Sequence, residues 1–403
     1  MKIYDYAIIG GGISGLLCGH LLKDFVILEK ENEIGGRTRS TNIGNIKVDI
    51  GAQFISNSLV RKLEKICDVK PFLKVEEPST VFVVNNKMII YKNFLKFLLN
   101  LPINWKKKIG FVWDIIKLYS IPSKKLNIIP AKQFLRNSTL DILRPVVLGL
   151  TSENPEDLSS SYIKFLFKNM TERIQTNIYE LISYLEKNLK DNIIYNANVS
   201  KISDKDNHFE IYYSKNKKHD TVIAKKVIFT IPADEIVTNF SNIIDEKKIL
   251  TLKKIRYSSC VVISVKIKKQ FPFFIYFMDK GPIWSLVNFS SIGKNIINLF
   301  ITGPETNDFI NMDENKIKKY AINFLTSENS FKLPISRNDI EDINIINWKK
   351  CLPICDTDFI SFKNAFEYSI DDRIFFCGDY SDIPSVEGCI RSVERVINQI
   401  KNI

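Results

Sequence analysis

Histidine is rare in this chain, with only three among 403 residues. Proteins bind transition metals mainly through clustered histidine, cysteine and carboxylate side chains, so the sequence predicts no metal site. No run of about 18 uncharged apolar residues occurs, and the signal of a membrane-spanning helix is therefore missing. The first residues lead straight into an apolar segment without a signal peptide, which predicts a cytoplasmic protein.

Paired cysteines are also missing. The odd number of cysteines and their irregular spacing exclude a disulfide framework and predict reduced, mostly buried thiols. They are Cys18, Cys67, Cys260, Cys351, Cys355, Cys377 and Cys389. The net charge of +12 is spread along the chain without a nucleic-acid-binding motif, so we expect no nucleic-acid partner.

The overall composition is typical of a globular protein. Apolar residues make up 45% of the chain, charged residues 25%, and phenylalanine and tyrosine are numerous. Since 403 residues exceed what one core usually carries, we expect two closely packed domains.

The first stretch that predicts chemistry is YDYAIIGGGISGLLCGHLLKDFVILE, residues 4–29. It reads as a strand, a glycine turn, an amphipathic helix and a second strand, which is the dinucleotide-binding βαβ unit. Gly10 permits the tight turn, Gly12 lets the backbone approach a pyrophosphate, and Gly15 lets the helix lie close to the strand. Glu29 can accept hydrogen bonds from the ribose hydroxyls.

A second glycine turn follows in ENEIGGRTRS. Gly35, Gly36 and Arg37 stand where small residues and a cation can close over the same pyrophosphate from the other side. From this turn onward the sequence resembles the FAD-dependent family that includes flavin amine oxidases, protoporphyrinogen oxidases, desaturases and renalase. The resemblance implies that the bound dinucleotide is FAD.

Two further segments carry the resemblance. VDIGAQFI, residues 48–55, resembles the family stretch that passes beside the flavin ring. RIFFCGDYSDIPSVEGCIRS resembles the C-terminal FAD motif: a strand over 373–377, a loop with Asp379, and a helix from about Ser385. The resemblance implies that Asp379 meets the ribityl chain or pyrophosphate. The helix N-terminus, from about Val386, would offer N–H groups to the flavin edge that becomes negative on reduction.

The middle of the chain resembles the family more loosely. Residues 145–162 resemble a turn into the helices of a substrate domain, and the implied role of Val199 is a backbone contact with adenine. Residues 251–304 read as strands of a substrate-facing sheet. The candidate wall residues of that sheet are Phe274, Tyr276, Trp284 and Phe289, although aromatic residues in sheets lie more often in the core.

The expected fold is a discontinuous, Rossmann-like α/β domain that binds FAD, together with a substrate domain of mixed sheet and helices. The expected FAD-binding parts are residues 1–80, 191–240 and 346–403, and the expected substrate parts are residues 81–190 and 241–345. The complete set of residues expected at the cofactor is Gly10, Gly12, Ile13, Ser14, Gly15, Glu29, Lys30, Gly35, Gly36, Arg37, Thr38, Gly51, Ala52, Gln53, Val199, Gly378, Asp379, Ser385 and Val386.

The reaction is less defined than the cofactor. The resemblance places the lysine of amine-oxidising members near Val262 and one aromatic residue of their amine cage at Ser385, so both markers are missing. Lys266 and Lys268 are expected in solvent on one strand face. We therefore expect an oxidoreductase that takes hydride from a C–H bond of a small or lipophilic substrate, with no catalytic residue named.

Alternatives remain open at this point. They are a flavin amine oxidase, a non-redox enzyme that resembles UDP-galactopyranose mutase, and a non-catalytic FAD-binding protein. Residues 93–126 mix apolar runs with lysines, which allows either helices packed on the core or peripheral contact with a membrane. Cys351 and Cys355 lie in the region from which some relatives attach flavin covalently, but we expect non-covalent FAD.

Overall fold

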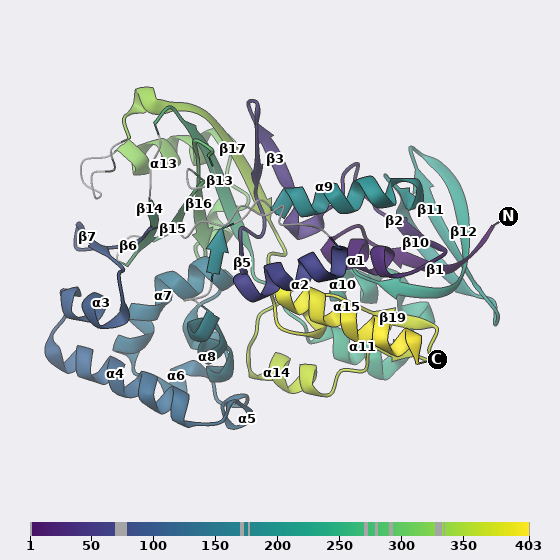
Figure 1. Cartoon of the computed structure of the whole chain (residues 1–403), viewed down its shortest axis with the longest axis horizontal. Coiled ribbons are helices and arrows are strands. Elements are labelled where there is room, and N and C mark those ends of the chain that lie inside the picture. The colour runs from purple at the N-terminus through teal and green to yellow at the C-terminus, as the bar shows by residue number, and fades with distance from the viewer. Residues whose placement is uncertain are drawn as a thin grey trace.

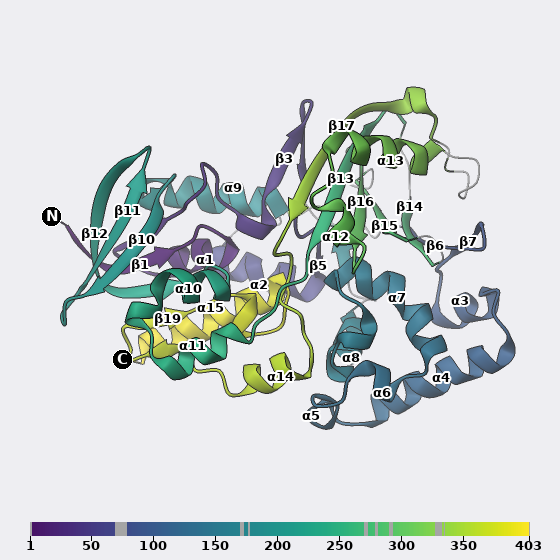
Figure 2. The same ribbon diagram turned by 180° about the vertical axis from the view of Figure 1, so that it is seen from behind.

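The computed structural model describes residues 2–68, 79–169, 173–175, 178–269, 273–278, 281–289, 293–326, 333 and 335–402. Two large sheets lie toward opposite ends of the long axis of the molecule (Figure 1). The eight-stranded sheet lies at the N-terminal side, and the seven-stranded sheet lies above a group of helices. Figure 2 shows the same arrangement from behind.

The eight-stranded sheet combines three distant parts of the chain. Its strands are β1 (Ile3–Ile9), β2 (Phe25–Leu28), β9 (Ile193–Ile194), β10 (Asn198–Asp204), β11 (Phe209–Lys215), β12 (Lys218–Phe229), β18 (Ser369–Ile370) and β19 (Ile374–Phe376). Strands β2, β1, β12 and β19 are neighbours in that order and run parallel. Their carboxyl ends therefore meet at one edge, where the chain continues to Gly10, Glu29, Thr230 and Cys377.

Helices from both ends and from the middle of the chain cover one face of this sheet. They are α1 (Ile13–Leu21), α2 (Asn57–Cys67), α9 (Ile178–Leu189) and α15 (Val386–Lys401). Their apolar sides form one core with Ile8 and Phe375 of the sheet. An apolar stripe of the last helix is buried, since Ile390, Val393 and Ile397 are almost inaccessible. This packing fixes α1 and α15 side by side at the same sheet edge.

The seven-stranded sheet has the order β17-β13-β16-β15-β14-β6-β7. These strands are β6 (Ser79–Val84), β7 (Lys87–Ile90), β13 (Cys260–Ile267), β14 (Phe273–Phe277), β15 (Ile283–Asn288), β16 (Ile296–Thr302) and β17 (Ile340–Trp348). On β13, Val261, Ile263 and Val265 enter a core that includes α13 (Glu314–Thr326). Because side chains alternate along a strand, Val262 faces the other way, toward the first sheet.

Smaller elements complete the fold. The short strands are β3 (Ser40–Ile43), β4 (Ile46–Asp49), β5 (Phe54–Ser56) and β8 (Arg173–Gln175). The remaining helices are α3 (Phe94–Asn100), α4 (Trp105–Ser120), α5 (Ser123–Leu126), α6 (Ala131–Phe134), α7 (Asn137–Thr151), α8 (Ser160–Asn169), α10 (Ala233–Phe240), α11 (Glu246–Lys253), α12 (Thr306–Phe309) and α14 (Thr357–Asn364). Among the described residues, no helix combines the length and apolar character needed to span a membrane.

The predicted fold class, a mixed α/β architecture with two sheets and helices, is confirmed. The strand ends fall within a residue of the expected positions: β2 ends at Leu28, before Glu29, and β19 covers Ile374–Phe376. The division into five domain segments stays a prediction. Its first boundary, at residue 80, directly follows residues 69–78, which lie outside the described part of the chain.

Candidate functional site

A cavity of about 780 Å³ opens at the carboxyl edge of the first sheet and continues to the second sheet. All residues predicted at the cofactor line it, except Gly15. Turns, strands and helix ends separated by more than 300 positions in the chain thus meet around one space. A volume of this size is typical of a cofactor or ligand site.

Gly15 has the packing role that the motif predicts for it. A Cβ atom at this position would lie 2.0 Å from the carbonyl oxygen of Gly10, so only glycine lets α1 approach β1 this closely. Gly12 is different, because a Cβ atom there would meet no atom within 4 Å. The backbone of Gly12 therefore borders the open cavity at the first turn of α1, where helix N–H groups attract phosphate.

The two glycine turns bind each other. The N–H group of Gly35 donates to the carbonyl oxygen of Gly11 at 2.8 Å, and Gly12 and Gly35 form an isolated parallel bridge. A Cβ atom on Gly36 would approach the Cα atom of Gly12 to 3.3 Å. The second turn thus lies against the first, and both border the place expected for the pyrophosphate.

Glu29 directly follows β2 and lines the cavity, and only 7% of its surface is exposed. Its carboxylate accepts hydrogen bonds from the N–H groups of Gly11 at 2.6 Å and Glu31 at 2.9 Å. These bonds fix the carboxylate while leaving lone pairs for ribose hydroxyls. Burial raises the pKa of Glu29 above its ordinary value.

We expect FAD affinity to fall as the pH falls through the raised pKa of Glu29. Protonation removes the negative charge that accepts hydrogen bonds from ribose, and because the pKa is raised, this happens at a higher pH than for an ordinary carboxylate. Glu29→Gln should bind FAD about tenfold or more weakly, without this pH dependence. The measurement is fluorescence titration of the apoprotein with FAD, from neutral to mildly acidic pH.

Glu33→Gln is the matched control, because Glu33 is 54% exposed and does not line the cavity. Its titration curve should match that of the wild type. An unchanged affinity and pH profile in Glu29→Gln would remove Glu29 from the FAD site.

An ion pair joins the N-terminal turn to the C-terminal loop. The Arg37 guanidinium donates to both carboxylate oxygens of Asp379, each at 2.8 Å, and to the carbonyl oxygen of Cys351 at 3.1 Å. The sequence predicted separate contacts of Arg37 and Asp379 with FAD, but not the ion pair between them. The two side chains lie 342 positions apart, so no local pattern indicated their contact.

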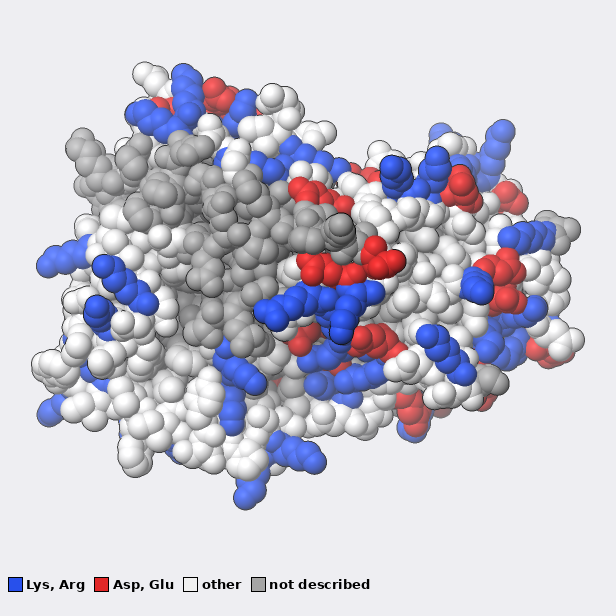
Figure 3. Space-filling view, viewed as in Figure 1, with Lys and Arg blue, Asp and Glu red and all other residues white. Residues whose placement is uncertain are grey.

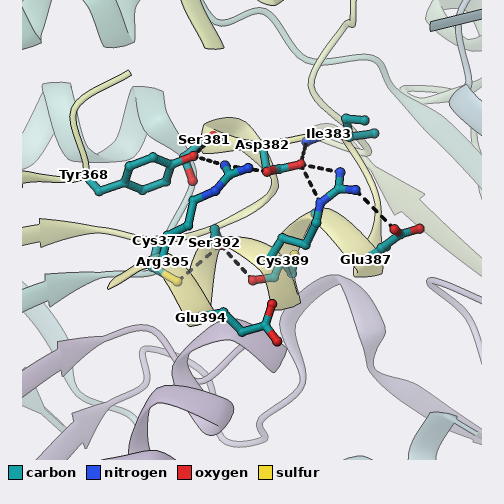
Figure 4. Close-up of polar contacts among 12 residues, drawn as sticks. Tyr368, Cys377, Ser381, Asp382, Ile383, Glu387, Cys389, Ser392, Glu394 and Arg395 are labelled. Atoms are coloured by element: carbon teal, nitrogen blue, oxygen red, sulfur yellow. Dashed lines mark hydrogen bonds and ion pairs between the residues drawn. The ribbon is translucent and has the colours of Figure 1, made fainter. Parts of the chain in front are cut away.

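The loop that carries Asp379 and Ser385 is held by a buried carboxylate (Figure 4). Asp382 has no exposed surface, accepts the N–H group of Ile383 at 2.6 Å, and pairs with Arg391 and Arg395 at 2.5 Å each. Both arginines come from α15, one helical turn apart. The sequence pattern contained this signal, an acid just before a helix with two arginines on one face, but we did not predict the cluster.

Ser385 begins the last helix as predicted. Its hydroxyl accepts the N–H group of Gly388 at 3.0 Å, which is an N-cap, and Val386 is the first helical residue. Gly388 is required here because a Cβ atom would lie 1.8 Å from the carbonyl oxygen of Ile383. The N-terminus of α15, with its partial positive charge, therefore borders the cavity.

The far part of the cavity is an apolar chamber. From α7, α8 and the strands β13, β15 and β16, the lining residues are Gly149, Leu150, Ser152, Tyr162, Phe165, Leu166, Cys260, Val262, Val287 and Phe300, and β17 of the same sheet adds Asn347 and Trp348. None of them carries a charge. The charged lining residues come instead from the turns near the glycines and from the segments around Glu235, Lys349, Asp379 and Glu387.

The four aromatic residues named as candidates for the cavity wall do not line it, which agrees with the preference of sheet aromatics for the core. Phe274, Tyr276 and Phe289 are buried in the core, and neither they nor Trp284 line the cavity. Rings at the cavity come from other elements, among them Phe300 on the neighbouring strand β16. The expectation for Lys266 is correct in part, because this residue lies away from the cavity but pairs with Glu341 at 3.0 Å.

The two candidate flavin-linking cysteines are placed differently. Cys355 is completely buried outside the cavity lining, whereas Cys351 lines the cavity. The Cys351 thiol lies 3.5 Å from the Ser152 hydroxyl and shares a hydrogen bond with Cys260, which lowers its pKa. Cys351 is therefore the one of the two that could reach a cofactor.

We expect FAD to be bound without a covalent link, because the Cys351 thiol is engaged by Ser152 and Cys260. Acid precipitation should release all of the flavin into the supernatant, as measured by its absorption. Cys351→Ser should retain the same flavin content as the wild type. A yellow wild-type pellet that becomes colourless in Cys351→Ser would contradict this prediction.

The cavity fits FAD on two observations. Gly12 leaves open space above a helix N-terminus, which a phosphate requires. The Oε1 atom of Gln53 is buried at the cavity and accepts no hydrogen bond from the residues that the structure describes, so it can accept one from a donor of the bound molecule. The described part of the chain contains no group of three or more histidine, cysteine or acidic side chains that could hold a metal ion.

Comparison with known proteins identifies the family. A model of the flavin-containing amine oxidoreductases matches residues 13–400. The chain belongs to this family. The predicted family and FAD cofactor are thereby confirmed, and the family is one of flavin-dependent oxidoreductases.

Individual relatives are more distant. The flavin-containing amine oxidase of Danio rerio is 36% identical over 96 residues, 22% of this chain and 18% of that protein, so the match covers about a fifth of the relative's length. Cyclohexylamine oxidase from Brevibacterium oxydans IH-35A has a TM-score of 0.79 at 12% identity and covers 100% of this chain and 99% of its own. A fatty acid isomerase from P. acnes has a TM-score of 0.70 at 14% identity, with 98% of both chains covered. These structural likenesses show the fold.

Proposed function

We propose that this flavoenzyme removes hydride from a C–H bond of a lipophilic organic substrate. The observation that carries the proposal is Val262, a 1% exposed residue that lines the cavity at the position where the family resemblance expects the lysine of amine-oxidising members. Ser385 supports it as well, because it caps α15 where the resemblance expects a cage aromatic.

The apolar chamber agrees with such a substrate. Its uncharged lining favours hydrocarbon over a charged amine, because an ammonium group would lose its hydration there without gaining a carboxylate partner. Val262, Val287 and Phe300 project from adjacent strands of one sheet, so they form a rigid wall. Phe165 and Leu166 of α8 contribute further apolar lining.

The reaction places few demands on the side chains. FAD supplies the hydride acceptor when bound. The chamber residues hold the substrate carbon near that acceptor and exclude water, which are the main requirements of hydride transfer. The N-terminus of α15, set by the Ser385 cap, stabilises negative charge that develops at the neighbouring edge of the cavity. Binding, orientation and hydride transfer need no acid–base residue, and the proton that must also leave the substrate to give a neutral product passes to solvent.

The experiment is anaerobic mixing of the purified flavoprotein with isoprenoids, porphyrinogens, reduced nicotinamides and amines, while the visible flavin band is recorded. We expect a lipophilic C–H donor to bleach the flavin and amines to leave it oxidised. Bleaching by amines alone would support the alternative, oxidation of a CH–NH bond. A flavin that no compound bleaches, and that needs an external reductant before turnover, would instead support a mutase-like enzyme.

A further inference from the structure

Exposed large apolar side chains are concentrated in one part of the surface. Among the described residues twelve such side chains are exposed, and ten of them lie between residues 88 and 128. They are Met88, Ile90, Leu95, Leu99, Trp105, Ile109, Trp113, Ile116, Tyr119 and Ile128. Scattered single apolar residues are normal on a surface, but a concentration like this marks an interaction site.

Helix α4 carries the centre of this patch. Trp105, Ile109, Trp113 and Ile116 follow each other at spacings of four, four and three, so they form one stripe along the helix. Their exposed fractions are 63%, 66%, 60% and 53%. The opposite side of the same helix is buried through Phe111 and other residues. Helix α4 thus has a second apolar face that the rest of the chain leaves uncovered.

Helix α3 extends the patch. The Lys108 side chain on α4 donates to the carbonyl oxygen of Leu99 at the end of α3, and the rings of Phe94 and Phe111 stack with centroids 5.8 Å apart. Figures 1 and 2 both show the two helices at the end of the molecule opposite the N-terminus. We call the exposed side chains of these helices the α3–α4 face.

The charged side chains around this face are almost all positive. Residues 79–140 contain ten lysines and one arginine but a single acid, Asp114. Asp114 is buried, where it binds Arg136 and accepts the Thr139 hydroxyl at 2.6 Å. Lys106 and Lys117 are exposed on α4, each next in sequence to a residue of the apolar stripe. In Figure 3 the surface over α3 and α4 is accordingly white and blue, without red.

We propose that the α3–α4 face docks on the surface of a bilayer that contains anionic lipid. The apolar stripe would enter the boundary between head groups and acyl chains, with Trp105 and Trp113 at the depth that tryptophan prefers. The surrounding lysines would lie against the negative head groups. A second copy of this chain fits less well, because its face carries the same positive charge.

The face lies one helix away from the cavity. On α8, Tyr162, Phe165 and Leu166 line the cavity, while the ring of Phe167 contacts Phe94 of α3 and Tyr119 of α4, each with centroids 6.2 Å apart. A docked enzyme would thus hold its apolar chamber close to the acyl chains. Only this delivery of substrate rests on the proposed function; the docking itself does not.

The test is sedimentation of the FAD-loaded full chain with phosphatidylcholine vesicles, with and without phosphatidylglycerol. We expect binding to the mixed vesicles, little binding to pure phosphatidylcholine, and a blue shift of tryptophan fluorescence on binding. Replacing Ile109 and Trp113 together by glutamate should lower the bound fraction at least tenfold. Both side chains point to solvent, so flavin content and melting temperature should not change.

Leu250→Glu is the matched control, because Leu250 is 54% exposed on α11, outside the α3–α4 face. It should bind vesicles like the wild type. The proposal is wrong if wild type stays in the supernatant with anionic vesicles, or if the Ile109 and Trp113 variant binds as strongly as wild type. A wild-type dimer that the variant converts to monomer, without vesicle binding, would assign the face to a second copy instead. Flavin bleaching without vesicles tests the proposed function separately.

Discussion

A Gly12→Val protein is expected to fold normally and to purify without the yellow colour of flavin. The backbone of Gly12 has φ −70° and ψ 176°, which any residue can adopt, and a Cβ atom there would meet no atom within 4 Å. The first side-chain carbon of valine therefore fits without a clash against the described residues. Its side chain fills the space above the N-terminus of α1, where the pyrophosphate of FAD must approach the backbone.

Flavin absorption relative to protein absorption measures the outcome, and thermal unfolding of the apoprotein provides the control. Gly12→Val apoprotein should melt at nearly the same temperature as wild-type apoprotein. Gly15→Val should instead lose stability, because its Cβ atom would overlap the carbonyl oxygen of Gly10 at 2.0 Å. A yellow Gly12→Val protein would contradict the placement of FAD.

Asp382→Ala is expected to lower the free energy of unfolding by about 1 to 3 kcal/mol, because it removes the buried carboxylate that Arg391, Arg395 and the N–H group of Ile383 share. It also frees the loop between β19 and α15, which positions Asp379 and Ser385 at the cavity. FAD affinity should therefore fall together with stability. Urea unfolding and FAD titration of the same variant measure the two effects.

Glu394→Ala is the control on the same helix. Glu394 pairs with Lys62 at 2.5 Å, but both side chains are more than a third exposed, so its loss should change stability by no more than about 1 kcal/mol. If Asp382→Ala unfolds at the same urea concentration as Glu394→Ala, the Asp382 cluster does not hold the loop.

Local signals and the family resemblance together predicted residues that the structure brings to one cavity. The glycine turns and Glu29 were predicted from neighbours within a few residues, whereas Asp379 and Ser385 were predicted from the resemblance. Contacts across the chain could not be predicted in this way. The Arg37–Asp379 pair depends on the parallel pairing of β12 with β19, which sets the C-terminal loop beside the N-terminal turns.

The residues that line the apolar chamber were also difficult to predict, because they depend on contacts between distant parts of the chain. Alternation shows that residues on one strand have two faces, but only the neighbouring elements decide which face meets the cavity. Phe274 and Tyr276 are therefore core residues, while Phe300 two strands away lines the chamber. Val262 lines the chamber, and it was singled out because the family resemblance supplied its register.

The most direct test of the central claim, that both ends of the chain build one FAD site facing an apolar chamber, is a crystal structure of the purified yellow protein. We predict electron density for one FAD in the cavity, with its ribose at Glu29, its pyrophosphate at Gly12, and its flavin ring between Ser385 and the wall at Val262. An empty cavity in a flavin-loaded protein, or a flavin ring directed away from Val262, would contradict the claim.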